Sequence, residues 1–137
     1  MENIAPGLIG TTTLMVAQEN TARHLGSGNV YVFATPEMVR LMEMAGVSAV
    51  DHLLPQGYRT VGMAVNVKHL AATPMGMKVT ARAELVEVDG RKLHFRVEAW
   101  DEQEKIGEGT HTRAIIDVQK FSQRVEEKAA RADKLPA

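Results

Sequence analysis

The sequence predicts an α+β fold in which a curved antiparallel sheet wraps one long helix. Three observations predict this fold. Residues 38–54 are apolar on nearly every face of a helix, which is typical of a buried helix. Residues 58–118 alternate between apolar and polar side chains, as strands do. An Asp-Gly pair at positions 89–90 then marks a tight hairpin inside that alternating stretch.

The first third of the chain predicts short elements. Residues 9–18 are rich in Thr and Val and favour a strand. A short helical turn is expected from residue 20, and the glycines Gly26 and Gly28 end it. Residues 30–33 are again β-prone.

The long helix has a recognisable start and end. Thr35 suits the N-cap, Pro36 is pre-set for the first helical position, and Glu37 favours the positive end of the helix dipole. The apolar run that follows predicts a helix buried on most faces. The sequence Pro-Gln-Gly at 55–57 is expected to end it.

The strands that follow predict a long antiparallel meander. Residues 61–67, 79–85 and 93–99 each alternate, and a last strand is expected over 106–118. In the first of these, the valines and Met63 are expected on one face of the sheet. A single sheet covers the helix only by curling round it, which is the hotdog architecture. Because one face and the edges of such a sheet stay unburied, we expect at least a homodimer, with a tetramer left open.

Length and composition limit the function classes. The 137 residues predict one domain, 1–137, with 119–137 as a peripheral C-terminal helical tail. The chain has no cysteine, which excludes a disulfide, a thiolate nucleophile and a zinc ribbon. A net charge of −1 disfavours a nucleic-acid partner. No apolar run reaches the ~20 residues that a membrane span needs, so no membrane partner and a cytoplasmic location are expected.

Glu43 is the least expected residue of the helix. It stands among apolar neighbours, where a carboxylate costs free energy unless it has a partner. A solvent-facing position or an interface salt bridge would explain it without function. A buried acid would instead be a candidate base for catalysis.

Thr35 and His69 are weaker candidates on position alone. Thr35 has a structural explanation as an N-cap, although a helix start also gathers free N–H groups that receive a carbonyl or an anion. His69 ends a strand next to a Pro/Gly loop, a place that suits a cleft or simply the surface. The other histidines, His111 among them, are interpreted as structural. No metal-ligand spacing, phosphate loop or nucleophile elbow is present, so no metal is expected.

Several segments together resemble the fluoroacetyl-CoA thioesterase family of hotdog proteins. The resemblance spans roughly residues 9–118. It is carried by residues 32–39 (VFATPEMV), 41–43 (LME), 60–62 (TVG), 69–76 (HLAATPMG), 87–91 (EVDGR) and 107–113 (GEGTHTR).

The resemblance implies hydrolysis of a short or medium acyl-CoA thioester to the free acid and CoA. It implies that Thr35, Glu43 and His69 act on the thioester, and that the backbone N–H of Gly62 faces its oxygen. Glu43 would attack directly or activate water, and His69 would orient or protonate. No cofactor is expected, since CoA is part of the substrate.

The phosphates of CoA favour cationic side chains. Lys68, Arg91 and Arg113 are candidates for these contacts, and solvated strand positions are the alternative interpretation. The sequence is also compatible with two other functions. A non-catalytic hotdog module would bind acyl-CoA or another small ligand intact, and a hydratase or dehydratase would act on enoyl-CoA.

Overall fold

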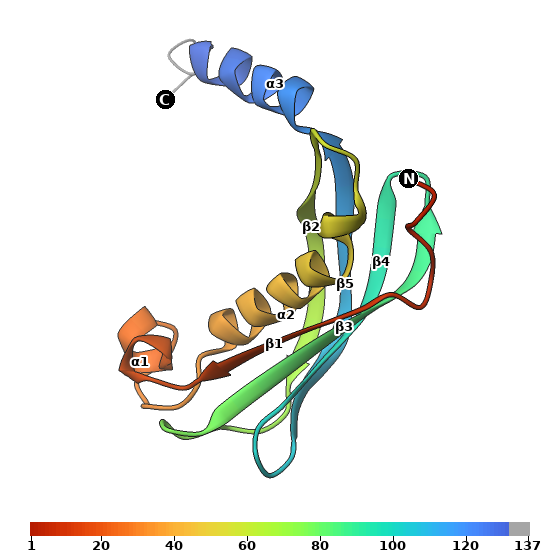
Figure 1. The fold of residues 1–137 in the computed structure, drawn as a ribbon. Coiled ribbons are helices and arrows are strands. Elements are labelled where there is room, and N and C mark those ends of the chain that lie inside the picture. Colours follow the sequence, from red (N-terminus) through yellow and green to blue (C-terminus); the bar gives the residue numbers. More distant parts are fainter. Residues whose placement is uncertain (132–137) are drawn as a thin grey trace.

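The computed structural model describes residues 1–131 and shows a five-stranded antiparallel sheet curled round one long helix (Figure 1). This confirms the predicted hotdog architecture. The strands run in the order β1-β3-β4-β5-β2, so β1 and β2 are the two edges. The elements are β1 (Ile9–Met15), η1 (Gln18–Asn20), α1 (Ala22–Leu25), α2 (Thr35–Val50), η2 (Asp51–Leu53), β2 (Tyr58–His69), β3 (Lys78–Asp89), β4 (Lys92–Trp100), β5 (Lys105–Asp117) and α3 (Val118–Ala130).

The N-cap and the first residue of the central helix α2 each lie one residue earlier than predicted. Ala34 is the N-cap and makes no side-chain cap hydrogen bond, whereas Thr35 is the first helical residue. The interpretation of Thr35 as an N-cap is therefore wrong, and its hydroxyl is free for another partner. The helix ends at Val50 and continues as the 3-10 turn η2, before the predicted stop at Pro55.

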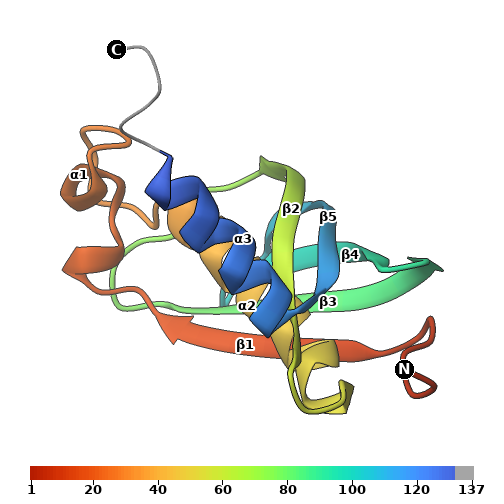
Figure 2. The same ribbon diagram turned by 90° about the horizontal axis from the view of Figure 1, so that it is seen from above.

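Helix α2 lies in the hollow of the sheet and packs closely on β1 (Figures 1 and 2). Gly10 of β1 makes this close approach possible, because a Cβ at that position would lie 2.5 Å from the backbone nitrogen of Ala49 and still closer to the carbonyl oxygen of Ala45. The helix residues buried in this core are Met38, Leu41, Met42, Ala45, Gly46, Ala49 and Val50.

The sheet leaves one side of α2 uncovered. Met44 and Val47 are exposed there, so the prediction of a helix buried on most faces is wrong for this side. Met63 and Val65 of the edge strand β2 are exposed as well. A sheet that closes only halfway round a helix cannot reach its far face, which leaves apolar surface on the concave side of the protomer.

A bulge in β2 changes which residues face the helix. The pairing of β2 with β5 shifts register between Gly62 and Ala64. As a result Thr60 and Gly62 face the same side as the buried residues of β5 before the bulge, and Val65 does so after it. The predicted regular alternation of Val61, Met63, Val65 and Val67 is therefore wrong. The bulge turns Gly62 toward α2.

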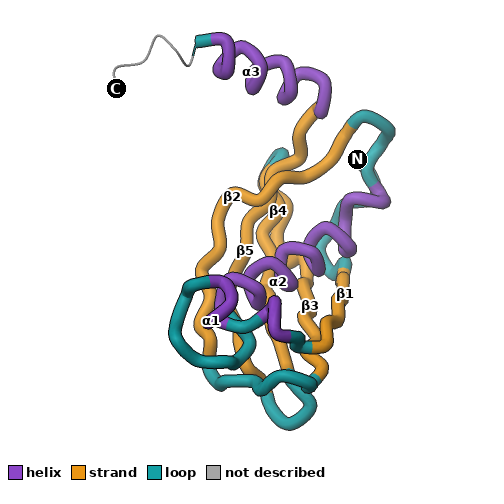
Figure 3. Tube along the Cα trace, turned by 90° about the vertical axis from the view of Figure 1, so that its left-hand side faces the viewer, coloured by secondary structure: helices purple, strands orange, loops and turns teal. Residues whose placement is uncertain are grey.

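Helix α3 follows directly from β5 and extends away from the sheet (Figures 1 and 3). The Asp117 side chain caps it by accepting a hydrogen bond from the backbone N–H of Lys120 at 3.2 Å. The predicted tail helix is present as far as Ala130, and positions 132–137 of that prediction lie outside the described residues. Among residues 1–131, no helix has both the length and the apolar character needed to cross a membrane.

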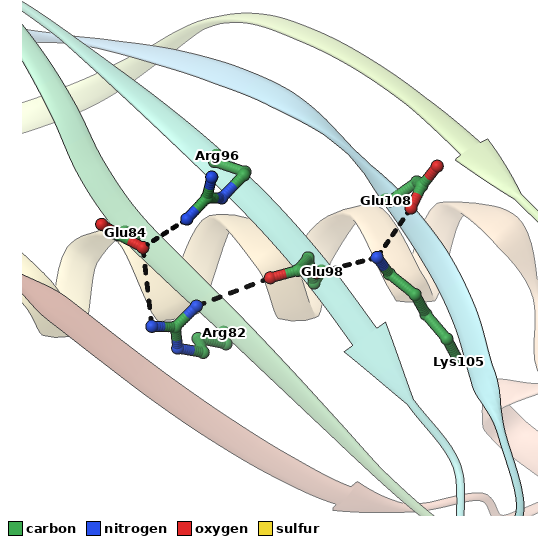
Figure 4. A network of polar contacts seen from close by, with 6 residues as sticks. All are labelled: Arg82, Glu84, Arg96, Glu98, Lys105 and Glu108. Carbon is green, nitrogen blue, oxygen red and sulfur yellow. Dashed lines mark hydrogen bonds and ion pairs between the residues drawn. The ribbon is translucent and has the colours of Figure 1, made fainter.

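The face of the sheet opposite α2 carries a network of charged side chains on β3, β4 and β5 (Figure 4). Acids and bases alternate along it, with N–O distances between 2.7 and 3.5 Å. Its members are Arg82, Glu84, Arg96, Glu98, Lys105 and Glu108. Partly exposed pairs of this kind contribute at most about 1 kcal/mol each. The network therefore marks a polar outer face, and the core lies on the side of α2.

Candidate active site

Thr35 and His69 form one pair of candidate site residues. The hydroxyl of Thr35 lies 2.7 Å from Nδ1 of His69, in hydrogen-bond contact. The first residue of α2 and the last residue of β2 thus meet, although they are 34 positions apart in the sequence. Both line a cavity of about 330 Å³ whose other walls include the small side chains of Ala71 and Ala72. The predicted cleft at the strand end is present.

The imidazole of His69 is favoured in its neutral form. Burial lowers its pKa from the ordinary value, because the charged ring is poorly solvated there. Its Nε2 atom is buried and has no hydrogen-bond partner among the described residues. A neutral ring has one donor and one acceptor nitrogen, and Nδ1 uses one of them on Thr35. Nε2 is therefore the unused hydrogen-bonding atom of this ring among the described residues.

Glu43 lies two turns further along α2 and faces Gly62. Its side chain is 40% exposed and lines a second, mostly apolar cavity of about 510 Å³. A Cβ built on Gly62 would lie only 2.6 Å from Oε2 of Glu43. The missing side chain at Gly62 therefore makes room for this carboxylate next to the backbone of β2. Glu43 is neither fully buried nor isolated in bulk water.

Arg113 places a positive charge beside Glu43. Its Nη1 lies 3.8 Å from Oε2 of Glu43, while the whole residue is only 5% exposed. Nε donates to the hydroxyl of Thr60 at 2.8 Å, and Nη2 donates to the backbone carbonyl of Thr60 at 3.0 Å. Burial lowers the pKa of Arg113, while the carboxylates of Asp51 and Glu43 act in the opposite direction. A guanidinium so enclosed does not suit the predicted contact with a phosphate of CoA.

His111 is a member of this cluster that the sequence interpretation missed. It is almost fully buried, its Nδ1 lies 2.8 Å from the carbonyl oxygen of Ala64, and its Nε2 lies 3.2 Å from Nη1 of Arg113. A carbonyl only accepts and a guanidinium only donates, so His111 is neutral with its proton on Nδ1. Thr110 and Thr112 flank it, which makes both faces of β5 polar here. No hydropathy signal distinguishes the inward face at this point.

The burial of His111 makes stability depend on pH. Its pKa is lowered by burial and by the positive charge of Arg113, and the carbonyl of Ala64 and the carboxylate of Glu43 oppose this. Below the ordinary histidine pKa of ~6.5, the unfolded chain takes up a proton that the folded chain refuses. Stability is therefore complete above that pH and falls as the pH drops through the window below it. One such proton changes the free energy of unfolding by up to about 1.4 kcal/mol per pH unit.

We therefore expect Tm to fall on acidification from about pH 7.5 to about pH 5.5, and to fall less in His111→Gln. Differential scanning calorimetry of both proteins and of His24→Gln, a change at an exposed histidine, measures this. An equal fall in Tm for His111→Gln and the wild type would contradict the assignment of this proton to His111.

Lys68 and Arg91 are placed differently from Arg113. Both are exposed. Arg91 lines a cavity of about 280 Å³ together with three other cationic side chains, Lys92, Lys120 and Arg124. The one acid of that cavity, Asp117, is used as the cap of α3. Lys68 stands on the outer side of β2 opposite Glu108 in the register. The three predicted CoA contacts therefore do not lie together.

The four predicted catalytic residues form two groups. Thr35 and His69 line one cavity, while Glu43 faces Gly62 at another. Eight residues of helix separate Thr35 from Glu43, about 12 Å along the axis. The first group supplies a hydroxyl and an imidazole, and the second supplies a carboxylate. Together these are the groups that acyl transfer from a thioester requires.

A comparison with known protein families shows to which family the chain belongs. The family described as fluoroacetyl-CoA-specific thioesterase matches residues 16–119. The chain belongs to this family. The enzyme is thus a thioester hydrolase that acts on acyl-CoA. A fluoroacetyl-CoA thioesterase of Streptantibioticus cattleyicolor is 44% identical over 124 residues, which cover 86% of this chain and 89% of the relative.

Solved structures agree with this thioesterase in fold. The structure of the fluoroacetyl-CoA thioesterase FlK superposes with a TM-score of 0.85 at 42% identity, covering 92% of this chain and 98% of that one. A hypothetical protein of Thermus thermophilus, a thioesterase superfamily member, has a TM-score of 0.91 at 30% identity over 98% and 100% of the two chains. A hot-dog-like protein from Thermanaerovibrio acidaminovorans has a TM-score of 0.85 at 23% identity, which supports the fold alone.

Proposed function

We propose that the thioesterase hydrolyses a short acyl-CoA, with fluoroacetyl-CoA as the first candidate substrate. Its 44% identical relative bears the name of that substrate. The observation that carries the catalytic part of the proposal is the Glu43 carboxylate held next to the backbone of Gly62. No cofactor enters the proposed reaction, because CoA is part of the substrate. We also propose a cytoplasmic location, since acyl-CoA thioesters are made and used inside cells.

In the proposed reaction Glu43 attacks the thioester carbon or removes a proton from an attacking water. The C–S bond then breaks, and the CoA thiolate leaves and takes up a proton. Attack by water gives the free acid directly, whereas attack by Glu43 gives a mixed anhydride that a water molecule hydrolyses to the free acid, which restores the carboxylate. The Gly62 N–H and the Thr35 hydroxyl stabilise the oxyanion, and such donors typically contribute ~3 kcal/mol each. His69, hydrogen-bonded to Thr35, orients that hydroxyl or supplies the proton to sulfur.

The test is release of free thiol from a panel of fluoroacetyl-, acetyl-, butyryl- and hexanoyl-CoA by the purified protein. We expect turnover with the highest kcat/KM on a two-carbon acyl group. A preference for hexanoyl-CoA would overturn the short-chain part of the proposal. Tight binding of every intact thioester without turnover would overturn catalysis and favour a binding module.

We propose that the active site is completed in a homodimer. Within one protomer Thr35 and Glu43 lie too far apart on α2 to act on one carbonyl. The exposed apolar residues Met44 and Val47 and the free edge of β2 lie on the side where a second copy would bring its own α2. In the proposed dimer, Glu43 of one protomer acts with Thr35 and His69 of the other. Pairing of dimers into tetramers stays a prediction.

Co-expression of Glu43→Gln with His69→Gln tests this arrangement. If the two residues of a site come from different protomers, each mixed dimer has one intact site. Random pairing of a two-fold symmetric dimer then restores about a quarter of wild-type activity. Activity no higher than that of the separate variants would show instead that one chain supplies both residues.

We further propose that the nucleotide end of CoA binds near Arg91. Lys68 is not part of that site, because it pairs with Glu108, whereas Lys92, next to Arg91, pairs with Ala114 six residues further along β5. Support comes from the four cationic side chains around the cavity beside α3. The double variant Arg91→Ala, Arg124→Ala should raise KM for acetyl-CoA about tenfold, the loss of roughly one charged phosphate contact. KM for the N-acetylcysteamine thioester, which lacks the nucleotide, serves as the control and should not change. An equal rise in KM for both substrates would contradict the assignment.

A further inference from the structure

A series of polar contacts connects the end of α2 to the carboxylate of Glu43 through the side chains of β2 and β5. It runs from Asp51 after α2, through Thr60 on β2, to Arg113 on β5. We propose that Asp51 and Thr60 are positioning residues that hold the Arg113 guanidinium in one orientation, and through it the Glu43 carboxylate beside Gly62. This inference rests on the proposed role of Glu43 in thioester hydrolysis.

The direction of every hydrogen bond in this chain is determined by chemistry. An ionised carboxylate only accepts, so Asp51 receives both the backbone N–H and the hydroxyl proton of Thr60. The Thr60 oxygen, having given its proton to Asp51, is left to accept from Nε of Arg113 at 2.8 Å. Asp51 therefore fixes the orientation of the Thr60 hydroxyl, and the hydroxyl in turn fixes the guanidinium. Each hydrogen bond in this series therefore has only one possible donor.

The guanidinium of Arg113 has little freedom to rotate. Nε donates to the hydroxyl of Thr60 and Nη2 donates to its carbonyl, while Nη1 faces Nε2 of His111. Gly46 of α2 lies over the side chain, and a Cβ there would come within 3.2 Å of Cδ of Arg113. With Thr60 and His111 as partners, Nη1 faces Oε2 of Glu43 at 3.8 Å. A satisfied buried network of this kind rigidifies its members.

Rotation of the guanidinium would release the carboxylate. The side chain of Glu43 is 40% exposed, and its contacts with the protein are to Arg113 and Gly62, which therefore fix its position. A reacting group displaced by about 1 Å typically costs about a hundredfold in rate. Loss of the Thr60 hydroxyl is expected to act in this way on kcat, because neither Asp51 nor Thr60 lines the cavity at Glu43.

Thr60→Val removes the hydroxyl while keeping the shape of the side chain. We expect kcat for acyl-CoA hydrolysis to fall about 10- to 100-fold with KM within about threefold of wild type. Thr60→Ser keeps the hydroxyl and should restore kcat to within about threefold. Thr112→Val is the matched control, because it removes a hydroxyl that contacts His94 on the other face of β5. It should leave kcat unchanged.

Two further measurements separate this inference from the proposed function. Glu43→Gln is assayed in the same series, and hydrogen exchange of the Arg113 Nε–H is followed by NMR in the wild type and the Thr60 variants. Slow exchange that is lost in Thr60→Val and regained in Thr60→Ser supports the proposal. Should Thr60→Val not fold, Asp51→Asn is judged by the same criteria, because an amide offers one acceptor oxygen where Thr60 donates to two.

A Thr60→Val enzyme with wild-type kcat, beside an inactive Glu43→Gln, would overturn the positioning role and leave the proposed function standing. A Thr60→Ser enzyme as slow as Thr60→Val would also overturn it, because the hydroxyl would then not be the cause. Full activity of Glu43→Gln would instead overturn the proposed function itself.

Discussion

Substituting Gln for Glu43 will lower kcat for acyl-CoA hydrolysis by about 10²- to 10⁴-fold, the range that a general base or nucleophile contributes. Glutamine keeps the size of the side chain next to Gly62 and Arg113 but neither attacks a carbonyl nor removes a proton from water. The fold should not change, since the side chain is half-exposed and the neighbouring Arg113 keeps its hydrogen bonds to Thr60 and His111. Steady-state thiol release with acetyl-CoA and fluoroacetyl-CoA measures the effect.

The matched control is Glu19→Gln, which makes the same chemical change at an exposed position before α1. It should retain wild-type kcat and KM. Far-UV circular dichroism and Tm of both variants show that any loss of activity is not a loss of fold. A Glu43→Gln enzyme as active as Glu19→Gln would leave the carboxylate without a role in hydrolysis.

The largest effect on stability is expected from Gly10→Ala. The new methyl group would meet the backbone of α2 at Ala45 and Ala49, and backbone cannot move aside as a flexible side chain does. Overpacking of a core typically costs 1–3 kcal/mol and occasionally more, and we expect about 3 kcal/mol here. For a domain of this size that corresponds to a fall in Tm of about 10 °C.

Gly28→Ala serves as its control. A Cβ at Gly28 would lie 3.5 Å from the Cβ of Ala22, an ordinary contact, and Gly28 has no positive φ. Thermal denaturation should give Gly28→Ala a Tm within about 2 °C of the wild type. Equal Tm values for the two glycine variants would contradict the close packing of α2 on β1.

Local signals predicted the elements of this fold well. The Asp-Gly pair places the hairpin where β3 ends at Asp89 and β4 begins at Lys92, with Gly90 at a φ of +60°. The Pro-Gln-Gly sequence after residue 54 likewise predicted the end of the helical segment. These features depend on backbone geometry that one or two residues determine. They are visible in sequence because no distant contact is needed to produce them.

The site was less accessible from sequence for two physical reasons. The bulge in β2 lies in an apolar alternation that looks regular, so the inward turn of Gly62 after Val61 carries no hydropathy signal. The cluster around Arg113 joins segments that are 53 and 62 positions away, and only the curled sheet brings them together. Glu43 was found because a carboxylate in an apolar helix is conspicuous. Its partners Thr60 and His111 were not, because each fits an ordinary strand.

The most direct test of the proposed active site is a crystal structure with a nonhydrolysable acyl-CoA analogue. The proposal predicts the analogue's carbonyl carbon within about 3.5 Å of a Glu43 oxygen, with its carbonyl oxygen in hydrogen-bond reach of the Gly62 N–H or the Thr35 hydroxyl. A carbonyl group bound in another cavity, with the Glu43 carboxylate turned to solvent, would contradict it.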